Sequence, residues 1–339
     1  MASSLGSDKK GKQLIVVSLP ENAYYRKSLK DIESFIRDMS ERSTGLDDVL
    51  VVYSNALEKG YKTNSTLPLA ANTRCLLVDE SLDLWMRDFC PVLPKYQVKF
   101  SYRPKYLKSK DAKFVESEFM KVLGRNMDIS LKSSDIVLDG GNVVDNNSNK
   151  VIISERIFVE NKGKSRHVLQ QEIENLLAAK VAFIPDPEDT TGHADGIVAF
   201  IEENVLAIAD FGDEDEYYRD VEVAVKSAFP NVETFRVPCG KQDSGSVDKK
   251  WKGFTDATGS YVNMLVTNNA IYVPQYGQTN YDKQALEIVR SHTSKTVVPV
   301  STKMLSHMGG SVRCMSWQME SSHPVAQALY KNSTIGKGS

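Results

Sequence analysis

The chain has 339 residues, of which 41% are hydrophobic and 25% charged, so it is long enough to bury one large core or two ordinary ones. A formal net charge of -2 gives no basic field for nucleic acid, and the first apolar run, QLIVVSL, is too short for a secretory leader or a membrane span. The four cysteines form no C-x-x-C pair and have no histidine at zinc-ligand spacing. We therefore expect a soluble cytoplasmic protein with no metal, nucleic-acid or membrane partner.

From the start of the chain, the polar, lysine-rich residues 1–12 are predicted to form a disordered arm, and residues 331–339 a disordered tail. Between them, short β-branched runs alternate with segments that carry apolar residues at three- and four-residue spacing. This spacing predicts helices at residues 24–39, 111–123, 166–178, 215–227 and 281–290. The alternation is typical of a mixed α/β protein.

Three pairs of apolar runs flank short polar turns and predict β-hairpins: VLDGGNVVDNNSNKVIISE, GIVAFIEENVLAIAD and YVNMLVTNNAIYVPQ. A helical segment and another strand follow each hairpin, which indicates a repeated strand-strand-helix-strand module. Such modules close best around an axis. Because no long Pro-, Gly- or Ser-rich linker divides the chain, we expect one domain over residues 13–330.

The segment DTTGHADGIVAF places His193 and Asp195 two residues apart at the predicted opening of a strand, so both side chains face one pocket. A histidine beside a carboxylate suits general acid and base chemistry. The alternative is a loop histidine that only hydrogen-bonds its neighbours.

The segment LWMRDFCPV contains Arg87 and Asp88 in an otherwise apolar run that we predict to be extended. Burying either charge is costly without a partner, which indicates a substrate contact or an internal ion pair. Neighbouring residues of an extended segment point in opposite directions, so Asp88 can face a pocket while Arg87 serves a structural pair.

Two glycine pairs accompany further reactive residues. In HMGGSVRCMSW, Gly309 and Gly310 precede a predicted strand with Cys314, a nucleophile once its thiol is ionised, although a free cysteine is often simply buried. In VLDGGNVV, Asp139 lies on a predicted hairpin strand before two glycines. That run is also a turn signal.

Taken together, the order of these segments resembles the agmatine deiminase and Porphyromonas-type peptidylarginine deiminase family of the guanidino-modifying superfamily. The matching pieces are W-x-R-D (85–88), D-G-G-N (139–142), D-x-x-G-H-x-D (189–195), S-Y-x-N (260–263), P-Q-Y-G (274–277) and G-G-x-x-x-C (309–314). The resemblance implies a five-bladed α/β propeller, or pentein, built from strand-strand-helix-strand modules, with no metal or organic cofactor.

The resemblance also implies roles for single residues. Cys314 attacks the guanidinium carbon, Asp88 and Asp195 bind its N-H groups, and His193 protonates the departing ammonia and then activates water. Asp139 lies where many members have Glu, and Arg313 where relatives often have His. Further substrate contacts are implied at Trp85, Gly192, Asn263, Gly309 and Gly310.

Two carboxylates are the natural partners of a planar cationic guanidinium. Without substrate, the same aspartates are expected to raise the pKa of the Cys314 thiol, so that it ionises when the cationic substrate arrives.

For the substrate, agmatine is the first expectation, with N-carbamoylputrescine and ammonia as products of a covalent thiouronium pathway. The segment FSYRPKYLKS is similar to the Arg-Pro-Arg segment of the Porphyromonas-type enzymes, where Arg103 and Lys105 would bind the carboxylate of arginine or a C-terminal peptidylarginine, giving citrulline. The alternative for both residues is a solvated basic loop. Amidino transfer by the same cysteine, and a catalytically silent propeller that binds a partner, are the competing functions; a homodimer is a further expectation.

Overall fold

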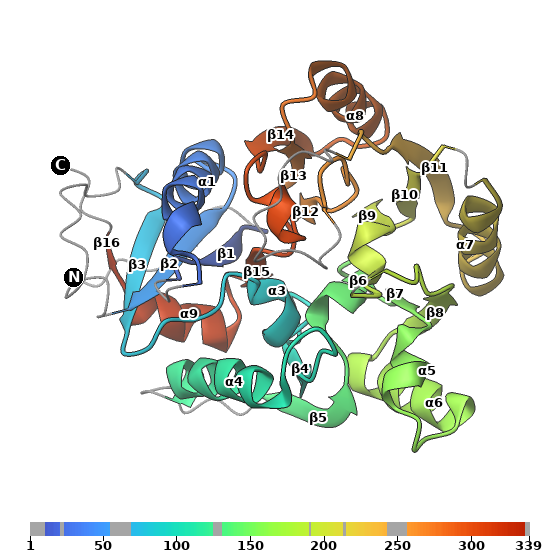
Figure 1. The fold of residues 1–339 in the computed structure, drawn as a ribbon, viewed down its shortest axis with the longest axis horizontal. Helices are drawn as coiled ribbons and strands as arrows, with labels where there is room; N and C mark the ends of the chain where they lie inside the picture. Colours follow the sequence, from blue (N-terminus) through green and yellow to red (C-terminus); the bar gives the residue numbers. More distant parts are fainter. Residues whose placement is uncertain are drawn as a thin grey trace.

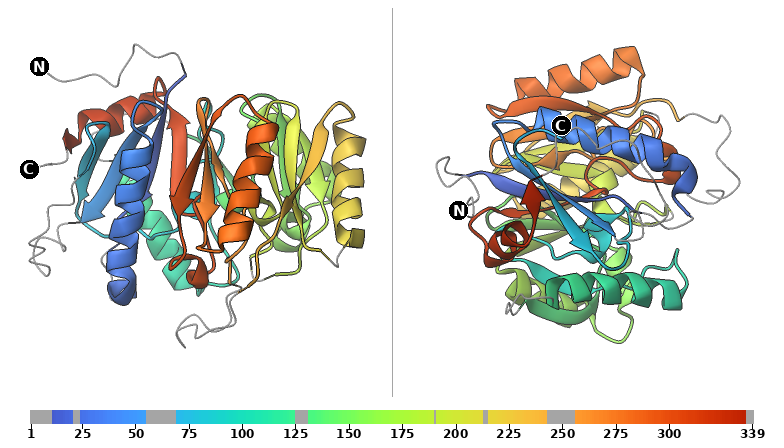
Figure 2. Two further views of the ribbon diagram at one scale, coloured as in Figure 1. Left: turned by 90° about the horizontal axis from the view of Figure 1, so that it is seen from above. Right: turned by 90° about the vertical axis from the view of Figure 1, so that its left-hand side faces the viewer.

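The computed structural model describes residues 11–20, 24–54, 69–124, 131–189, 191–212, 215–242 and 256–335. Strands in these ranges form five separate sheets grouped around a central region, and the longer helices lie at the periphery (Figures 1 and 2). The fold is therefore α/β, as the sequence predicts. No helix within the described ranges is both long and apolar enough to cross a membrane.

The largest sheet joins the beginning and the end of the described chain. Its strands, in the order β15-β1-β2-β3-β16, are Ser316–Glu320, Gln13–Ser18, Asp48–Ser54, Thr73–Val78 and Thr334–Ile335. The three central strands are parallel, and both outer strands pair antiparallel to them. Helix α1 (Leu29–Arg42), which follows the 3-10 turn η1 (Arg26–Ser28), connects β1 to β2, and α9 (Pro324–Lys331) precedes β16.

Three sheets have the predicted strand-strand-helix-strand module. They consist of β6 (Val144–Asp145), β7 (Lys150–Ser154), α6 (Arg166–Leu177) and β8 (Lys180–Ile184); β9 (Val198–Glu202), β10 (Val205–Asp210), α7 (Asp215–Ala228) and β11 (Glu233–Pro238); and β12 (Leu265–Val266), β13 (Ala270–Gln275), α8 (Thr279–Ser291) and β14 (Thr296–Ser301). In each, an antiparallel hairpin is followed by a helix that leads to a parallel partner. The hairpin predictions and the repeated module are confirmed.

The fifth sheet is a parallel pair, β4 (Val98–Ser101) and β5 (Lys132–Val137), connected by α4 (Ser109–Gly124). Two short helices complete the frame, α3 (Met86–Phe89) and α5 (Arg156–Glu160). All five predicted helices exist, with shifted boundaries. The sequence pattern does not predict β4, β16 and α9, because these segments are short and two of them lie close to the end of the chain.

Each helix packs on its sheet through a narrow apolar face. In α1, Ile32, Phe35, Ile36 and Met39 recur at three- and four-residue spacing and are almost completely buried. This is the pattern of an amphipathic helix that covers a sheet. The reactive residues lie elsewhere, in the turns at the inner ends of the strands.

Those turns correct four predictions of local structure. Arg87 and Asp88 lie on the helical turn α3 instead of an extended segment, since Cys90 N donates to Met86 O. His193 and Asp195 lie at the 3-10 turn η3 (Ala194–Gly196) ahead of β9, and Cys314 lies in a turn before β15. Asp139 precedes the 3-10 turn η2 (Gly140–Asn142) and is not on a hairpin strand.

The predicted disordered ends also need correction where they are described. Lys331 is the last residue of α9, and Thr334 pairs with Cys75 of β3, so residues 331–335 are ordered. Lys12, assigned to the arm, forms an ion pair of 3.0 Å with Asp48. Residues 1–10 and 336–339 lie outside the described part of the chain.

A buried aspartate links the first sheet to the sheet of β12–β14. Asp47 is fully buried and accepts hydrogen bonds from Gln13 N (3.0 Å), Thr267 Oγ1 (2.8 Å) and Tyr272 OH (2.8 Å). Burial raises the pKa of this carboxyl, and the three donors oppose that effect. Segments more than 200 residues apart in sequence are thereby tied together.

Asp47→Ala should lower the free energy of unfolding by about 3 kcal/mol, because three buried donors lose a charged acceptor. Urea unfolding followed by circular dichroism measures this change, with Glu41→Gln on the exposed side of α1 as the control. A loss no larger than that of the control would show that the link contributes nothing.

Candidate active site

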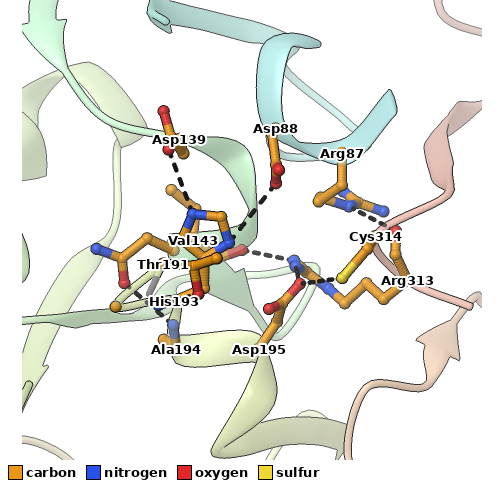
Figure 3. A network of polar contacts seen from close by, with 12 residues as sticks. Arg87, Asp88, Asp139, Val143, Thr191, His193, Ala194, Asp195, Arg313 and Cys314 are labelled. Carbon is orange, nitrogen blue, oxygen red and sulfur yellow. Dashed lines mark hydrogen bonds and ion pairs between the residues drawn. The ribbon is translucent and has the colours of Figure 1, made fainter. Parts of the chain in front are cut away.

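A cavity of about 260 Å³ opens where turns from several sheets meet. Four of the predicted catalytic residues, Asp88, His193, Asp195 and Cys314, line it, and Figure 3 shows them converging from separate segments. The other lining residues are Trp85, Tyr106, Pro187, Asp189, Thr191, Gly196, Ile197, Phe211, Tyr217, Gln242, Asp256, Ala257, Ser260, Asn263, Met308, Gly309 and Gly310.

Asp88 is a buried carboxylate with one oxygen held and one oxygen unused. Its Oδ2 accepts a hydrogen bond of 3.0 Å from the hydroxyl of Tyr106, whereas its Oδ1 accepts none from the described residues. A buried oxygen without a donor is costly, so the site is built to receive a donor that enters the cavity. In the segment FSYRPKYLKS, the sequence predicts Arg103 and Lys105 as substrate contacts. The residue that reaches Asp88 is instead Tyr106, which was not predicted.

His193 lies between two carboxylates. Its Nε2 is 3.3 Å from Asp139 Oδ2, and its Nδ1 is 3.7 Å from Asp88 Oδ1 (Figure 3). Gly141 makes this approach possible, since a side chain there would overlap both the imidazole and Asp88. The absence of a side chain at Gly141 therefore lets the ring lie within reach of both acids.

The electrostatics of this group follow from burial and from its three acids. Burial alone would lower the pKa of His193, but Asp88, Asp139 and Asp195 outweigh it and raise the pKa to about 10. Burial likewise raises the pKa of Asp88 to about 7, although His193 and Tyr106 oppose the shift. The imidazole therefore carries a proton at neutral pH and can serve as a general acid.

Two asparagines lock the turns together. Asn142 Oδ1 accepts from Ser154 N (2.8 Å) and Ala194 N (3.2 Å), which holds η2 against η3. Asn263 Nδ2 donates to Asp195 O (3.3 Å), while its Oδ1 accepts from the backbone N-H of Cys314 (3.4 Å). Asn263, predicted as a substrate contact, also lines the cavity and joins the thiol segment to the Asp195 turn.

The Cys314 thiol faces this cavity beside acidic groups. Its Sγ is 3.4 Å from Asn263 Oδ1 and 4.0 Å from Asp195 Oδ2. Burial, followed by the charges of Asp195 and Asp88, raises the pKa of the thiol well above its ordinary value. The direction agrees with the sequence-based hypothesis that the thiol ionises when a cation enters.

Arg313 is a site residue whose contact the sequence reading did not anticipate. Its Nη1 donates to Asp195 Oδ2 at 2.8 Å and its Nη2 to Val143 O at 2.6 Å (Figure 3). Arg87, in contrast, forms no contact with an acid within 4 Å among the described residues; it donates to Gln318 Oε1 at 3.1 Å. The structural ion pair predicted for Arg87 is therefore not found among the described residues, and the arginine that pairs with an acid here is Arg313, with Asp195.

The glycine-rich turns carry the walls of the cavity. Gly309 has a φ of 96°, a conformation that favours glycine, and Gly310 lies against the ring of Trp85, where a side chain would overlap it. Trp85, Gly309 and Gly310 all line the cavity as predicted. Gly192 does not line it, and instead packs against the side chain of Arg156.

Charge is distributed unevenly over the cavity wall. The lining includes four aspartates, Asp88, Asp189, Asp195 and Asp256, and among the described lining residues there is no Lys or Arg. Arg103 and Lys105 are exposed and are not part of the lining. The wall is therefore suited to a cation. Among the described residues, no group of three or more His, Cys, Asp or Glu side chains could hold a metal ion.

Comparison with known proteins gives a family match over most of the chain. The model of the Porphyromonas-type peptidyl-arginine deiminase family matches residues 6–319. A curated relative, the putative agmatine deiminase of Streptococcus mutans, is 24% identical over 215 residues. That alignment covers 56% of this chain, and the chain spans only 58% of the relative's length.

Solved structures share the fold over nearly the whole chain. The agmatine deiminase of C. jejuni superposes with a TM-score of 0.72 at 18% identity, covering 91% of this chain and 94% of that one. The agmatine deiminase of Enterococcus faecalis gives a TM-score of 0.71 at 19% identity, covering 94% and 95%. At these identities the likeness establishes a common fold.

In ligand-free protein the imidazole of His193 should stay protonated until about pH 10. Because this value lies above the ordinary histidine pKa near 6.5, the charged ring contributes stability that is fully present below about pH 6.5 and is lost as the pH rises through about 10. Carbon-detected NMR of histidine-labelled protein measures the titration, and His193→Gln assigns the resonance. Asp139→Asn should lower the midpoint; a wild-type midpoint near 6.5 would contradict the assignment.

Proposed function

The chain belongs to the Porphyromonas-type peptidyl-arginine deiminase family, and from this premise we propose that it is a guanidine iminohydrolase that converts agmatine and water to N-carbamoylputrescine and ammonia. One observation carries the proposal: a half-buried thiol lies with a protonated imidazole and two carboxylates in a cavity with an acidic wall. The names of the relatives support the same reaction class.

We further infer that the five sheets are the blades of a pentein propeller. Three of them have the complete strand-strand-helix-strand module, and the β1–β3 and β4–β5 sheets are variants of it. The turns that carry Asp88, His193, Asp195 and Cys314 lie at inner strand ends, which is where a propeller places its central pocket. We also propose that the blades make up a single catalytic domain.

The guanidinium binds between Asp88 and Asp195. Asp88 Oδ1 lacks a donor, and Asp195 has one oxygen held by Arg313, so each carboxylate has an oxygen to offer to an N-H group. A guanidinium presents such groups in a rigid planar fork. The carbon between them then lies within reach of the Cys314 sulfur, which is close to Asp195.

The first chemical step forms a carbon-sulfur bond and breaks a carbon-nitrogen bond. The positive charge of the substrate favours the thiolate of Cys314, and the proton of the thiol leaves to solvent. Attack on the guanidinium carbon gives a tetrahedral adduct, which expels ammonia after one nitrogen receives the proton of His193. The products are free ammonia and a cationic thiouronium on Cys314.

The second step reverses the roles of the same groups. His193, now neutral, takes a proton from a water molecule as the water oxygen bonds to the thiouronium carbon, which gives a tetrahedral adduct with a hydroxyl group. The carbon-sulfur bond then breaks as the hydroxyl becomes the carbonyl of the ureido product, and the hydroxyl proton passes to the departing sulfur, so Cys314 regains its thiol state. Asp139 positions His193 for both steps through its contact with Nε2.

Charge favours agmatine over arginine. Agmatine carries an amine at the end remote from the guanidinium, whereas arginine also carries a carboxylate. The described cavity wall contains Asp189 and Asp256 in addition to the two guanidinium ligands, and no described Lys or Arg. A second positive charge is therefore accommodated better than a negative one.

Cys314→Ala should abolish ammonia release from agmatine, a loss of more than about 10⁴-fold in kcat, because it removes the group that forms the intermediate. Agmatine should still bind to this variant in calorimetry. Asp88→Asn and Asp195→Asn should lose binding as well. Cys75→Ser, on β3 and outside the cavity, is the matched control.

If wild-type protein releases no ammonia from agmatine, arginine or C-terminal peptidylarginine, the proposal is overturned. Normal turnover by Cys314→Ala would rule out the covalent mechanism.

The double variant Arg103→Ala/Lys105→Ala should keep kcat/KM for agmatine within about twofold, since both side chains are exposed and outside the cavity. The comparison with arginine decides the alternative substrate. If arginine is a substrate and the double variant loses it selectively, the two cations bind its carboxylate and the preference for agmatine is wrong.

A further inference from the structure

Arg313 connects the nucleophile segment to the opposite wall of the site. It immediately precedes Cys314, is only 8% exposed, and uses both terminal nitrogens, one on Asp195 Oδ2 and one on Val143 O. The ion pair is short, at 2.8 Å, and its acid has a side chain only 3% exposed. Removing one partner of such a buried pair leaves an uncompensated charge.

The two acids assigned to the guanidinium are held by different kinds of donor. Tyr106, a neutral hydroxyl, holds Asp88, whereas Arg313, a permanent cation, holds Asp195. In each case one oxygen is held, and no hydrogen bond from a described residue to the other oxygen is found. The two acids therefore differ in the charge of the donor that holds them.

The groups around Asp195 make that charge important. On the cavity side, the sulfur of Cys314 is 4.0 Å away, and the charge of Asp195 acts on both Asp88 and His193. A neighbouring negative charge disfavours ionisation of a second carboxyl group beside it. Within the described ranges, Arg313 is the one Lys or Arg side chain that lies within 4 Å of Asp195.

Behind the wall lie two further charged residues. Arg87 reaches the carbonyl oxygen of Arg313 at 3.5 Å, and Asp145 is close enough to Arg87 and Arg313 for their charges to oppose the rise in its pKa that burial causes. Burial and the charge of Arg313 lower the pKa of Arg87 to about 9. Among these neighbours, Arg313 alone donates a hydrogen bond from a charged group to Asp195.

Resting on the proposed function, we propose that Arg313 is a positioning residue that keeps Asp195 ionised and fixed by one oxygen, so that its other oxygen is ready for the guanidinium. A histidine at this position would supply a charge that depends on pH. Arginine supplies it throughout the working range. Its role is therefore more than packing behind the pocket.

The direct test measures the ionisation of Asp195 without substrate. In Cys314→Ala protein labelled with ¹³C at aspartate carboxyls, Asp195→Asn assigns the Asp195 signal. Adding Arg313→Met should raise the titration midpoint of Asp195 by about 1–3 pH units, the usual effect of losing an opposite charge at this distance. Arg313→Lys, which keeps the charge, should restore most of the parent midpoint and shows that any loss is not simple unfolding.

A second readout measures protons released when agmatine binds. Calorimetry at pH 6 in two buffers of different ionisation enthalpy gives this number for each variant in the Cys314→Ala background. With Arg313→Met, agmatine must displace a proton from Asp195, so release should rise by up to about one proton, and the affinity should fall at least about tenfold and recover partly at pH 8. A merely structural residue would weaken binding equally at both pH values.

Arg87→Met is the matched control, because Arg87 is an equally buried neighbouring arginine without a direct acidic partner. It should lower the melting temperature, while the Asp195 midpoint and the proton release move much less than in Arg313→Met, because Arg87 acts on Asp195 only through its more distant charge. An unchanged Asp195 midpoint in Arg313→Met, or an equal shift in Arg87→Met, would overturn the proposal. Failure of agmatine to bind the parent would instead count against the proposed function, since the carboxyl titration needs no ligand.

Discussion

The site depends on one constraint, which is the burial of three carboxylates around a single imidazole. Asp88, Asp139 and Asp195 are all less than a tenth exposed, and in the part of the chain that the structure describes only His193 and Arg313 supply positive charge within 4 Å of them. With all five groups ionised, three negative charges face two positive ones. A cavity with this deficit favours one additional cation, and it resists any ligand that brings a negative charge.

The fold supports that strained arrangement from outside the cavity. Each reactive side chain is on a turn between buried elements. Asn142 joins two of these turns as an acceptor, and Asn263 joins two as both donor and acceptor. Separate apolar clusters under the sheets stabilise the frame independently of the acids. Acidic residues that repel each other can therefore remain close, because the stability of the sheets offsets the cost.

The sequence predicts the parts of this structure that repeat or that follow a period. Hairpins, crossover helices and the three-module pattern are set by local alternation of apolar residues, so they could be read directly. The motifs that contain Asp88, His193, Asp195 and Cys314 also picked out four residues that line one cavity. The turn conformations of Asp88, His193 and Cys314 could not be read, since contacts from distant segments decide them. The same holds for Tyr106 and Arg313, whose partners lie 18 and 118 residues away in sequence.

The charge deficit also explains how a half-buried cysteine can be inert in the empty cavity and reactive once a cation binds. Burial and two aspartates keep the thiol of Cys314 protonated when the cavity is empty, which protects it from oxidation and from neutral electrophiles. A bound guanidinium neutralises the aspartates and places a positive carbon beside the sulfur, so the same contact that selects the substrate also lowers the pKa of the nucleophile. Binding and activation are then one electrostatic event, and specificity for a cation requires no separate gate.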